Sequence, residues 1–131
     1  MRVLFDTNVL YSAFTSKGFC EEVVDEAAGD CLIIWSPPLQ AELVSLLTRR
    51  NKIGPGAQAA LAAFAELCEC VEPQPLPAPV CRDADDDIVL ATALAAQADF
   101  IVTGDDDLLT LKEHQGIRIV SPREFWKILV P

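Results

Sequence analysis

Short apolar runs recur along the chain, with longer amphipathic segments between them. The runs typical of buried strands are Arg2–Phe5, Leu32–Trp35, 68–72, Phe100–Thr103 and 117–120. The segments between them repeat apolar residues at helical spacing, at about 8–15, 19–29, 37–50, 57–67, 87–98, 106–114 and from Pro122 onward. Because unbroken apolar strands that alternate with helices form parallel sheets covered on both faces, the pattern predicts an α/β fold. We expect three layers, α/β/α, around a mostly parallel sheet of about four or five strands.

Length and composition fit one folded domain that comprises residues 1–131. The chain is 51% hydrophobic and 23% charged, which is typical of a globular protein. Its proline-rich stretch, 73–86, is expected to be a connection inside that domain. The five cysteines are irregularly spaced and suit reduced thiols. No apolar run approaches the roughly 20 residues of a membrane span, and no signal-peptide core follows Met1, so we expect a cytoplasmic protein without a membrane partner.

The net charge of −10 at first argues against a nucleic-acid partner. Affinity for nucleic acids comes mainly from lysine and arginine, which neutralise phosphates. An acidic chain can still bind a polyanion when divalent metal ions convert its carboxylates into a cationic site. The positions of the acids therefore decide the question.

Two acids directly follow predicted strands. Asp6 comes after the first strand, and Asp105 comes after Phe100–Thr103 and Gly104. Glycine at this position allows a sharp turn and a close approach of the backbone to a bound group. Ligand sites of parallel sheets form beyond the carboxyl ends of the strands, so both acids are candidate ligands.

Two further acids share helix faces with apolar residues. Glu42 lies at helical spacing from Leu39, Leu43 and Leu46, and Asp87 from Ala91, Leu94 and Ala98. Glu42 alone is more often a solvated helix edge, and the run Asp85-Asp86-Asp87 alone is usually an acidic turn or a helix cap. Four carboxylates in one crevice would repel one another, and a bound Mg²⁺ or Mn²⁺ removes that conflict. Together the four acids therefore indicate a metal site.

Four segments carry a resemblance to a known family. They are Val3-Leu-Phe-Asp-Thr-Asn-Val-Leu10, Ser36-Pro-Pro-Leu-Gln-Ala-Glu-Leu43, the stretch from Arg82 to Asp99, and Phe100-Ile-Val-Thr-Gly-Asp-Asp-Asp-Leu-Leu109. In these segments the chain resembles PIN-domain proteins, and most closely the VapC-like toxin branch. The resemblance extends over essentially the whole chain and implies a PIN-like fold.

The resemblance also implies an activity and a set of site residues. It implies an endoribonuclease that uses one or two Mg²⁺ or Mn²⁺ ions, held by the acidic quartet Asp6, Glu42, Asp87 and Asp105, with Asp107 as a further metal ligand. Asn8 and Thr103 would orient ligands or water from behind the metal ligands. The third acid has a competing assignment one residue away, at Asp86; we favour Asp87 because it directly precedes Ile-Val-Leu-Ala, as in the family pattern.

By the same resemblance, an antitoxin protein would hold the RNA-cleaving toxin inactive, and the toxin would form a homodimer. For the RNA substrate we expect contacts from Arg49 and Arg50, at the end of the helix that carries Glu42. Basic residues in a last helical turn are equally explained by the helix dipole. The alternative function is a non-catalytic PIN-fold interaction module that keeps the acids but acts through a protein partner.

Overall fold

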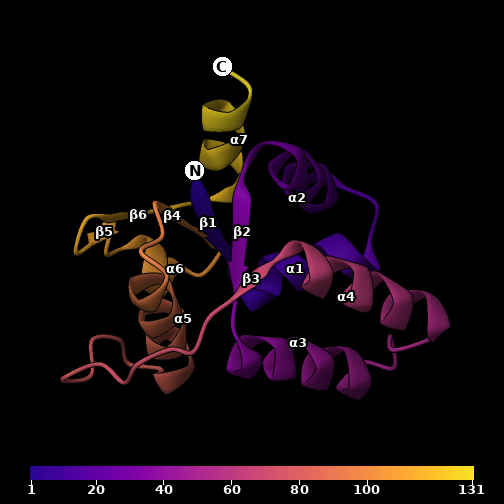
Figure 1. Ribbon diagram of the computed structural model, residues 1–131, viewed down its shortest axis with the longest axis horizontal. Coiled ribbons are helices and arrows are strands. Elements are labelled where there is room, and N and C mark those ends of the chain that lie inside the picture. Colours follow the sequence, from indigo (N-terminus) through magenta and orange to yellow (C-terminus); the bar gives the residue numbers. More distant parts are fainter.

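In the computed structural model, which describes residues 1–131, one six-stranded sheet lies between helices (Figure 1). The strands are β1 (Arg2–Phe5), β2 (Leu32–Trp35), β3 (Glu69–Cys70), β4 (Phe100–Val102), β5 (Glu113–His114) and β6 (Ile117–Val120). They lie in the order β3-β2-β1-β4-β6-β5, and every neighbouring pair is parallel except β5 and β6. The predicted α/β fold with a mostly parallel sheet is confirmed, although the sheet has six strands rather than about four or five.

Seven helices cover the two faces of the sheet. They are α1 (Thr7–Thr15), α2 (Phe19–Asp30), α3 (Pro37–Arg49), α4 (Pro55–Leu67), α5 (Ala84–Ala95), α6 (Asp106–Leu109) and α7 (Pro122–Leu129). The helices α5 and α6 lie on one side of the sheet, and α1, α2 and α4 lie on the other (Figure 1). Helix α3 contacts both α1 and α5 and so links the two sides. None of the seven helices has the length and apolar character needed to span a membrane.

The central strands are apolar because helices cover both of their faces. In β1, Val3, Leu4 and Phe5 are at most 1% exposed. They belong to a cluster of 29 buried hydrophobic residues that also includes Leu90 of α5 and Leu43 of α3. Burial of this apolar surface is the main driving force for packing the helices onto the sheet.

The strand order creates a crevice between β1 and β4. From β1 the chain first adds β2 and β3 in one direction, then crosses over and adds β4 and β6 in the other direction. Such a reversal separates the connections that follow the two central strands, and ligands bind at that point beyond the carboxyl ends. Phe5 is in register with Val102, so Asp6 and Thr103 come next to each other at the end of the sheet.

Two of the predicted helices, 87–98 and 106–114, have other bounds in the structure, where they run over Ala84–Ala95 and Asp106–Leu109. The predicted helix 106–114 ends at Leu109, and β5 and β6 form a hairpin whose turn residues, Gln115 and Gly116, have φ of 50° and 86°. Such positive φ angles suit a tight two-residue hairpin turn. The predicted helix 87–98 begins earlier, at Ala84, because the Asp83 side chain accepts a hydrogen bond from the Asp85 N–H and so caps it.

Candidate metal centre

Asp6 is fixed at the end of β1 by two hydrogen bonds. It is 5% exposed and caps α1, where its Oδ1 accepts the Thr7 N–H at 2.7 Å. Its Oδ2 accepts the Thr103 hydroxyl at 2.7 Å. Burial raises the pKa of Asp6, the two hydrogen bonds act in the opposite direction, and the charge of Asp105 adds to the increase. Because each carboxylate oxygen has two lone pairs, each Asp6 oxygen can still accept another partner.

Thr103 connects the ends of β1 and β4. Its buried hydroxyl donates to Asp6 and accepts the N–H of Asp105 at 3.0 Å. Asp105 in turn caps α6, where its Oδ1 accepts the Asp107 N–H at 2.9 Å. This chain of bonds fixes Asp6, Asp105 and Asp107 relative to one another.

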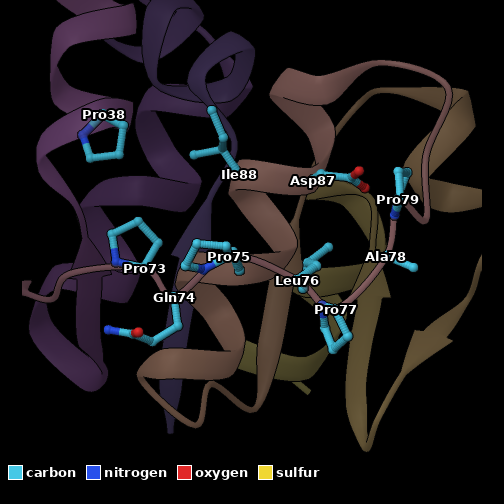
Figure 2. A pocket seen from close by; sticks show the side chains of 11 residues that line it. Pro38, Pro73, Gln74, Pro75, Leu76, Pro77, Ala78, Pro79, Asp87 and Ile88 are labelled. Atoms are coloured by element: carbon cyan, nitrogen blue, oxygen red, sulfur yellow. The ribbon is translucent and has the colours of Figure 1, made fainter.

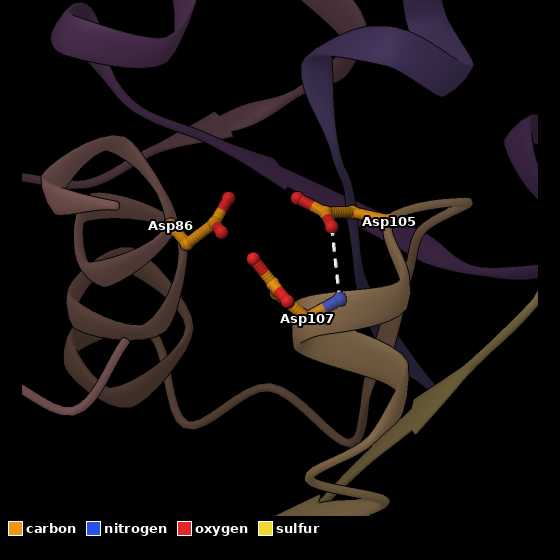
Figure 3. A group of neighbouring side chains, drawn as sticks. All are labelled: Asp86, Asp105 and Asp107. Carbon is orange, nitrogen blue, oxygen red and sulfur yellow. Dashed lines mark hydrogen bonds between the residues drawn. The ribbon is translucent and has the colours of Figure 1, made fainter. Parts of the chain in front are cut away.

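Helix α5 supplies another acid from the opposite side of the crevice. Asp86 shares a helix face with Val89, Leu90 and Ala93, which are at most 2% exposed, and is itself 6% exposed. Figure 3 shows the Asp86 carboxylate facing those of Asp105 and Asp107. One carboxylate oxygen from each of the three residues lies within 4.8 Å of the others. We call these three residues the acidic cluster.

One oxygen of the acidic cluster lacks a hydrogen-bond donor. Asp86 Oδ2 is buried without a partner, which is costly for a polar atom. Burial is the largest cause that raises the pKa of Asp86, and together with the charge of Asp105, a hydrogen bond with Asp105 and the charges of Asp6 and Asp83 it brings that pKa to about 7. A cation would satisfy this oxygen and remove the repulsion. An all-oxygen donor set fits a hard divalent ion such as Mg²⁺ or Mn²⁺.

The structure does not place Asp87 in the acidic cluster. Its Oδ1 accepts the Cys81 N–H at 2.8 Å, and both its oxygens lie 3.3 Å from the Val80 nitrogen. Figure 2 shows Asp87 beside Pro79, among the residues that line a groove of about 400 Å³. The geometry therefore favours Asp86 over Asp87 as the acid that α5 contributes to the candidate site. Successive residues of a helix point about 100° apart, and it is Asp86, not Asp87, that shares the buried face of Val89, Leu90 and Ala93.

Glu42 lies at the edge of the buried face of α3, which consists of Leu39, Leu43 and Leu47. Burial raises the pKa of Glu42, the nearby Thr7 hydroxyl lowers it, and the charges of Asp85, Asp6 and Asp83 raise it. The Thr7 hydroxyl is itself buried without a hydrogen-bond partner. Glu42 therefore lies within the electrostatic influence of Asp6 but outside the acidic cluster.

A cleft of about 650 Å³ lies beside the acidic cluster. It is lined by Asn8, Val9, Ser12, Cys20, Arg82, Gly104, Asp105, Asp106, Asp107 and Pro122. Asn8, expected to orient ligands, is among these residues. Arg49 and Arg50 are not, and the Arg50 guanidinium instead lies 5.3 Å from the centre of the Tyr11 ring.

The only basic residue of this cleft, Arg82, did not stand out in the sequence. Its Nη2 lies 2.8 Å and 3.0 Å from the two carboxylate oxygens of Asp107. The feature of the sequence that could have indicated Arg82 is its position directly before Asp83, the residue that caps α5. A cap fixes the start of a helix, so the residue before it lies at the same end of the helix as Asp86.

Comparisons with known proteins identify the fold and the family of this chain. A search of curated proteins finds no match. Among solved structures, the chain is similar to one in the crystal structure of VapBC2 from Rickettsia felis, bound to a DNA fragment from the promoter. The TM-score is 0.65 at 16% identity, over 92% of this chain and 98% of that one. The family model for the PIN domain matches residues 2–107. With most of its length matched by that model, the chain belongs to the PIN domain family.

Proposed function

We propose that this protein is a metal-dependent endoribonuclease. The observation that carries the proposal is the acidic cluster, with its unpaired Asp86 oxygen, at the point where the sheet reverses its strand order. Membership of the PIN domain family supports a nuclease. The proposed quartet is Asp6, Glu42, Asp86 and Asp105, with Asp107 as a further ligand. Asp86 replaces Asp87 in this set because Asp87 is bonded elsewhere.

In the proposed hydrolysis, different residues of the chain have different roles. A bound Mg²⁺ or Mn²⁺ would make the attacking water more acidic and stabilise negative charge on the phosphate. Asp86, Asp105 and Asp107 would hold the ion through carboxylate oxygens. Thr103 keeps Asp6 oriented toward the same crevice.

Glu42 is the proposed general base. Its raised pKa and partial exposure suit a carboxylate that takes a proton from water. In the proposed step, water oxygen bonds to phosphorus and gives its proton to Glu42. The bond from phosphorus to the leaving ribose oxygen breaks, and that oxygen is protonated from solvent.

The biological setting is proposed from the similarity to VapBC2. That structure contains a complex on promoter DNA, and its fold is shared over 92% of this chain. We therefore propose that this chain is the toxin of a toxin–antitoxin pair, inhibited by an antitoxin protein, and that it acts on RNA in the cytoplasm as a homodimer. Co-purification with the product of an adjacent small reading frame, and a molar mass measured by light scattering, would test these two associations.

The decisive experiment is RNA cleavage by the purified, partner-free protein. We expect cleavage of a single-stranded RNA pool with Mg²⁺ or Mn²⁺, and none after chelation. Asp6→Asn should abolish turnover and keep the fold, as measured by circular dichroism. Asp30→Asn is the matched control, because Asp30 is exposed at the end of α2.

Two outcomes would contradict the proposal. Undiminished cleavage by pure Asp6→Asn protein would remove Asp6 from the site. If the folded wild-type protein cleaves no RNA under any of these conditions, the interaction module becomes the better interpretation.

A further inference from the structure

Arg82 is an exposed side chain that is nevertheless fixed in place. Its side chain is 86% exposed, yet Nη2 lies 2.8 Å and 3.0 Å from the two oxygens of Asp107. An ion pair this exposed contributes little to stability. The contact does, however, orient the guanidinium beside the acidic cluster.

The backbone before Arg82 is anchored as well. The N–H groups of Val80 and Cys81 donate to the Asp87 carboxylate at 3.3 Å and 2.8 Å. Directly after Arg82, the Asp83 side chain caps α5. The backbone at Arg82 therefore lies between two anchored segments. Little backbone conformational entropy is lost there when a ligand binds.

Most of the donors of Arg82 are free. A guanidinium has five N–H groups, and the contacts with Asp107 involve Nη2 alone. Nε and Nη1 make no hydrogen bond within the chain and each can donate to an acceptor oxygen of a ligand. Phosphate oxygens are the charged acceptors that RNA offers, and a guanidinium donor binds them by charge-assisted hydrogen bonds.

The cleft has no other cationic side chain. Its charged residues are Arg82 and the acids Asp105, Asp106 and Asp107, within a chain of net charge −10. The positive charge that attracts a polyanion into this cleft would come from the bound metal ion and from Arg82. Arg49 and Arg50, at the end of α3, do not line it.

We propose that Arg82 is a substrate-binding residue that takes the non-bridging oxygens of an RNA phosphate beside the one that is cleaved. The inference rests on the proposed ribonuclease function for the identity of the ligand. It adds a cationic contact to a site otherwise made of carboxylates. Asp107 then has two roles: it is a metal ligand, and it orients Arg82.

The test is direct binding of RNA, measured separately from cleavage. The probe is a fluorescein-labelled single-stranded RNA of random sequence, titrated in Ca²⁺ and followed by fluorescence anisotropy. We expect Arg82→Ala to weaken binding by about tenfold and to reduce the salt dependence by about one phosphate contact. Arg118→Ala is the matched control, since Arg118 is exposed on β6 and its guanidinium stacks on Phe100, outside the cleft.

A second variant separates phosphate binding from the orientation of Asp107. Arg82→Gln removes the charge but keeps a side-chain amide that can donate to Asp107, with a shorter reach than arginine. We expect Gln to bind RNA as weakly as Ala does, and both variants to raise KM much more than they lower kcat. Normal RNA binding by Arg82→Gln would overturn the proposal and leave Arg82 as a partner of Asp107 alone.

The outcomes distinguish this inference from the proposed function. If the wild-type protein cleaves RNA but Arg82→Ala and Arg118→Ala bind it equally well, Arg82 does not bind RNA, and the proposed ribonuclease function is kept. If the wild-type protein binds RNA through Arg82 without cleaving it, the ribonuclease falls and the contact stands. If it neither binds nor cleaves RNA, both are overturned.

Discussion

Two neighbouring aspartates in the first turn of α5 enter two different environments. Asp86 faces Asp105 and Asp107 and has a buried oxygen without a donor. Asp87 faces the proline-rich segment and accepts N–H groups from Val80 and Cys81. The first carboxylate lacks a positive partner, whereas the second already has donors. Both residues are aspartates, so residue type does not distinguish them. The hydrogen-bond donors around each carboxylate separate a candidate metal ligand, which has an unpaired oxygen, from a structural anchor, which has none to spare.

The largest expected difference is in metal binding. Asp86→Asn should weaken Mn²⁺ binding by about tenfold or more, with a larger loss of RNA cleavage, because a ligand oxygen is replaced. Asp87→Asn should leave Mn²⁺ affinity nearly unchanged. Isothermal titration calorimetry of both variants provides the measurement, and each variant serves as the other's control. Equal loss of Mn²⁺ affinity in both variants would break the distinction.

A smaller effect is expected on the stability of the proline-rich segment. Asp87→Ala removes the acceptor of the Val80 and Cys81 N–H groups and should cost about 1–2 kcal/mol of unfolding free energy. Hydrogen exchange of residues 73–82 should accelerate, and urea denaturation gives the free energy. Asp85→Ala is the control, because Asp85 is exposed in the same turn. Unchanged exchange in Asp87→Ala would contradict the anchoring role.

The next prediction concerns pH in the absence of metal. Since the pKa of Asp86 rises from 3.8 to about 7 on folding, the folded state binds more protons than the unfolded chain between these values. Stability should therefore be greatest at about pH 4 and below and fall as the pH rises to about 7, by about 1–4 kcal/mol of unfolding free energy or several degrees in Tm.

Thermal unfolding in EDTA at pH 5.0 and 7.5 measures this slope. Asp86→Asn should flatten it, and Mn²⁺ should restore the lost stability at the higher pH. A slope that is identical in wild type and Asp86→Asn would show that other groups cause it.

The smallest expected effect is on Cys81, which lies between the two environments. Burial raises the pKa of its thiol to about 11, together with a hydrogen bond to Asp87 and the charges of Asp87, Asp86 and Asp105. At pH 8, iodoacetamide should therefore label Cys81 more slowly than the exposed Cys70. Asp87→Asn should speed labelling of Cys81 severalfold, as measured by mass spectrometry of peptides. No change in that rate would exclude Asp87 as a cause.

The sequence predicted the parts of the site that follow strands. Asp6 and Asp105 end unbroken apolar runs, and a parallel sheet brings the ends of such runs together, so no knowledge of helix orientation was needed. The acid from α5 was harder to assign. Three consecutive aspartates fit either register, and an error of one residue turns a side chain by about 100°. The cap at Asp83, which determines the register, is visible only with the backbone in place.

The hairpin of β5 and β6 was not predicted from the apolar pattern, for another reason. Two residues in β5 are too few to show an alternation of apolar and polar positions. Arg82 was missed because its ion pair joins residues 25 positions apart. Periodicity describes contacts within one element, whereas this contact depends on how α5 and α6 pack.

The position of β1 also determines when the protein can fold during synthesis. This strand is synthesised well before one of its two neighbours, because β4 begins at Phe100 and the hydroxyl that fixes Asp6 belongs to Thr103. Pairing over such a separation is slow, because a long loop must close before the contact stabilises it. The sheet is therefore incomplete until β6 has been translated, and the acidic cluster is incomplete until Asp107 has been translated. The candidate metal site cannot form before that point, whatever the first strand has already done.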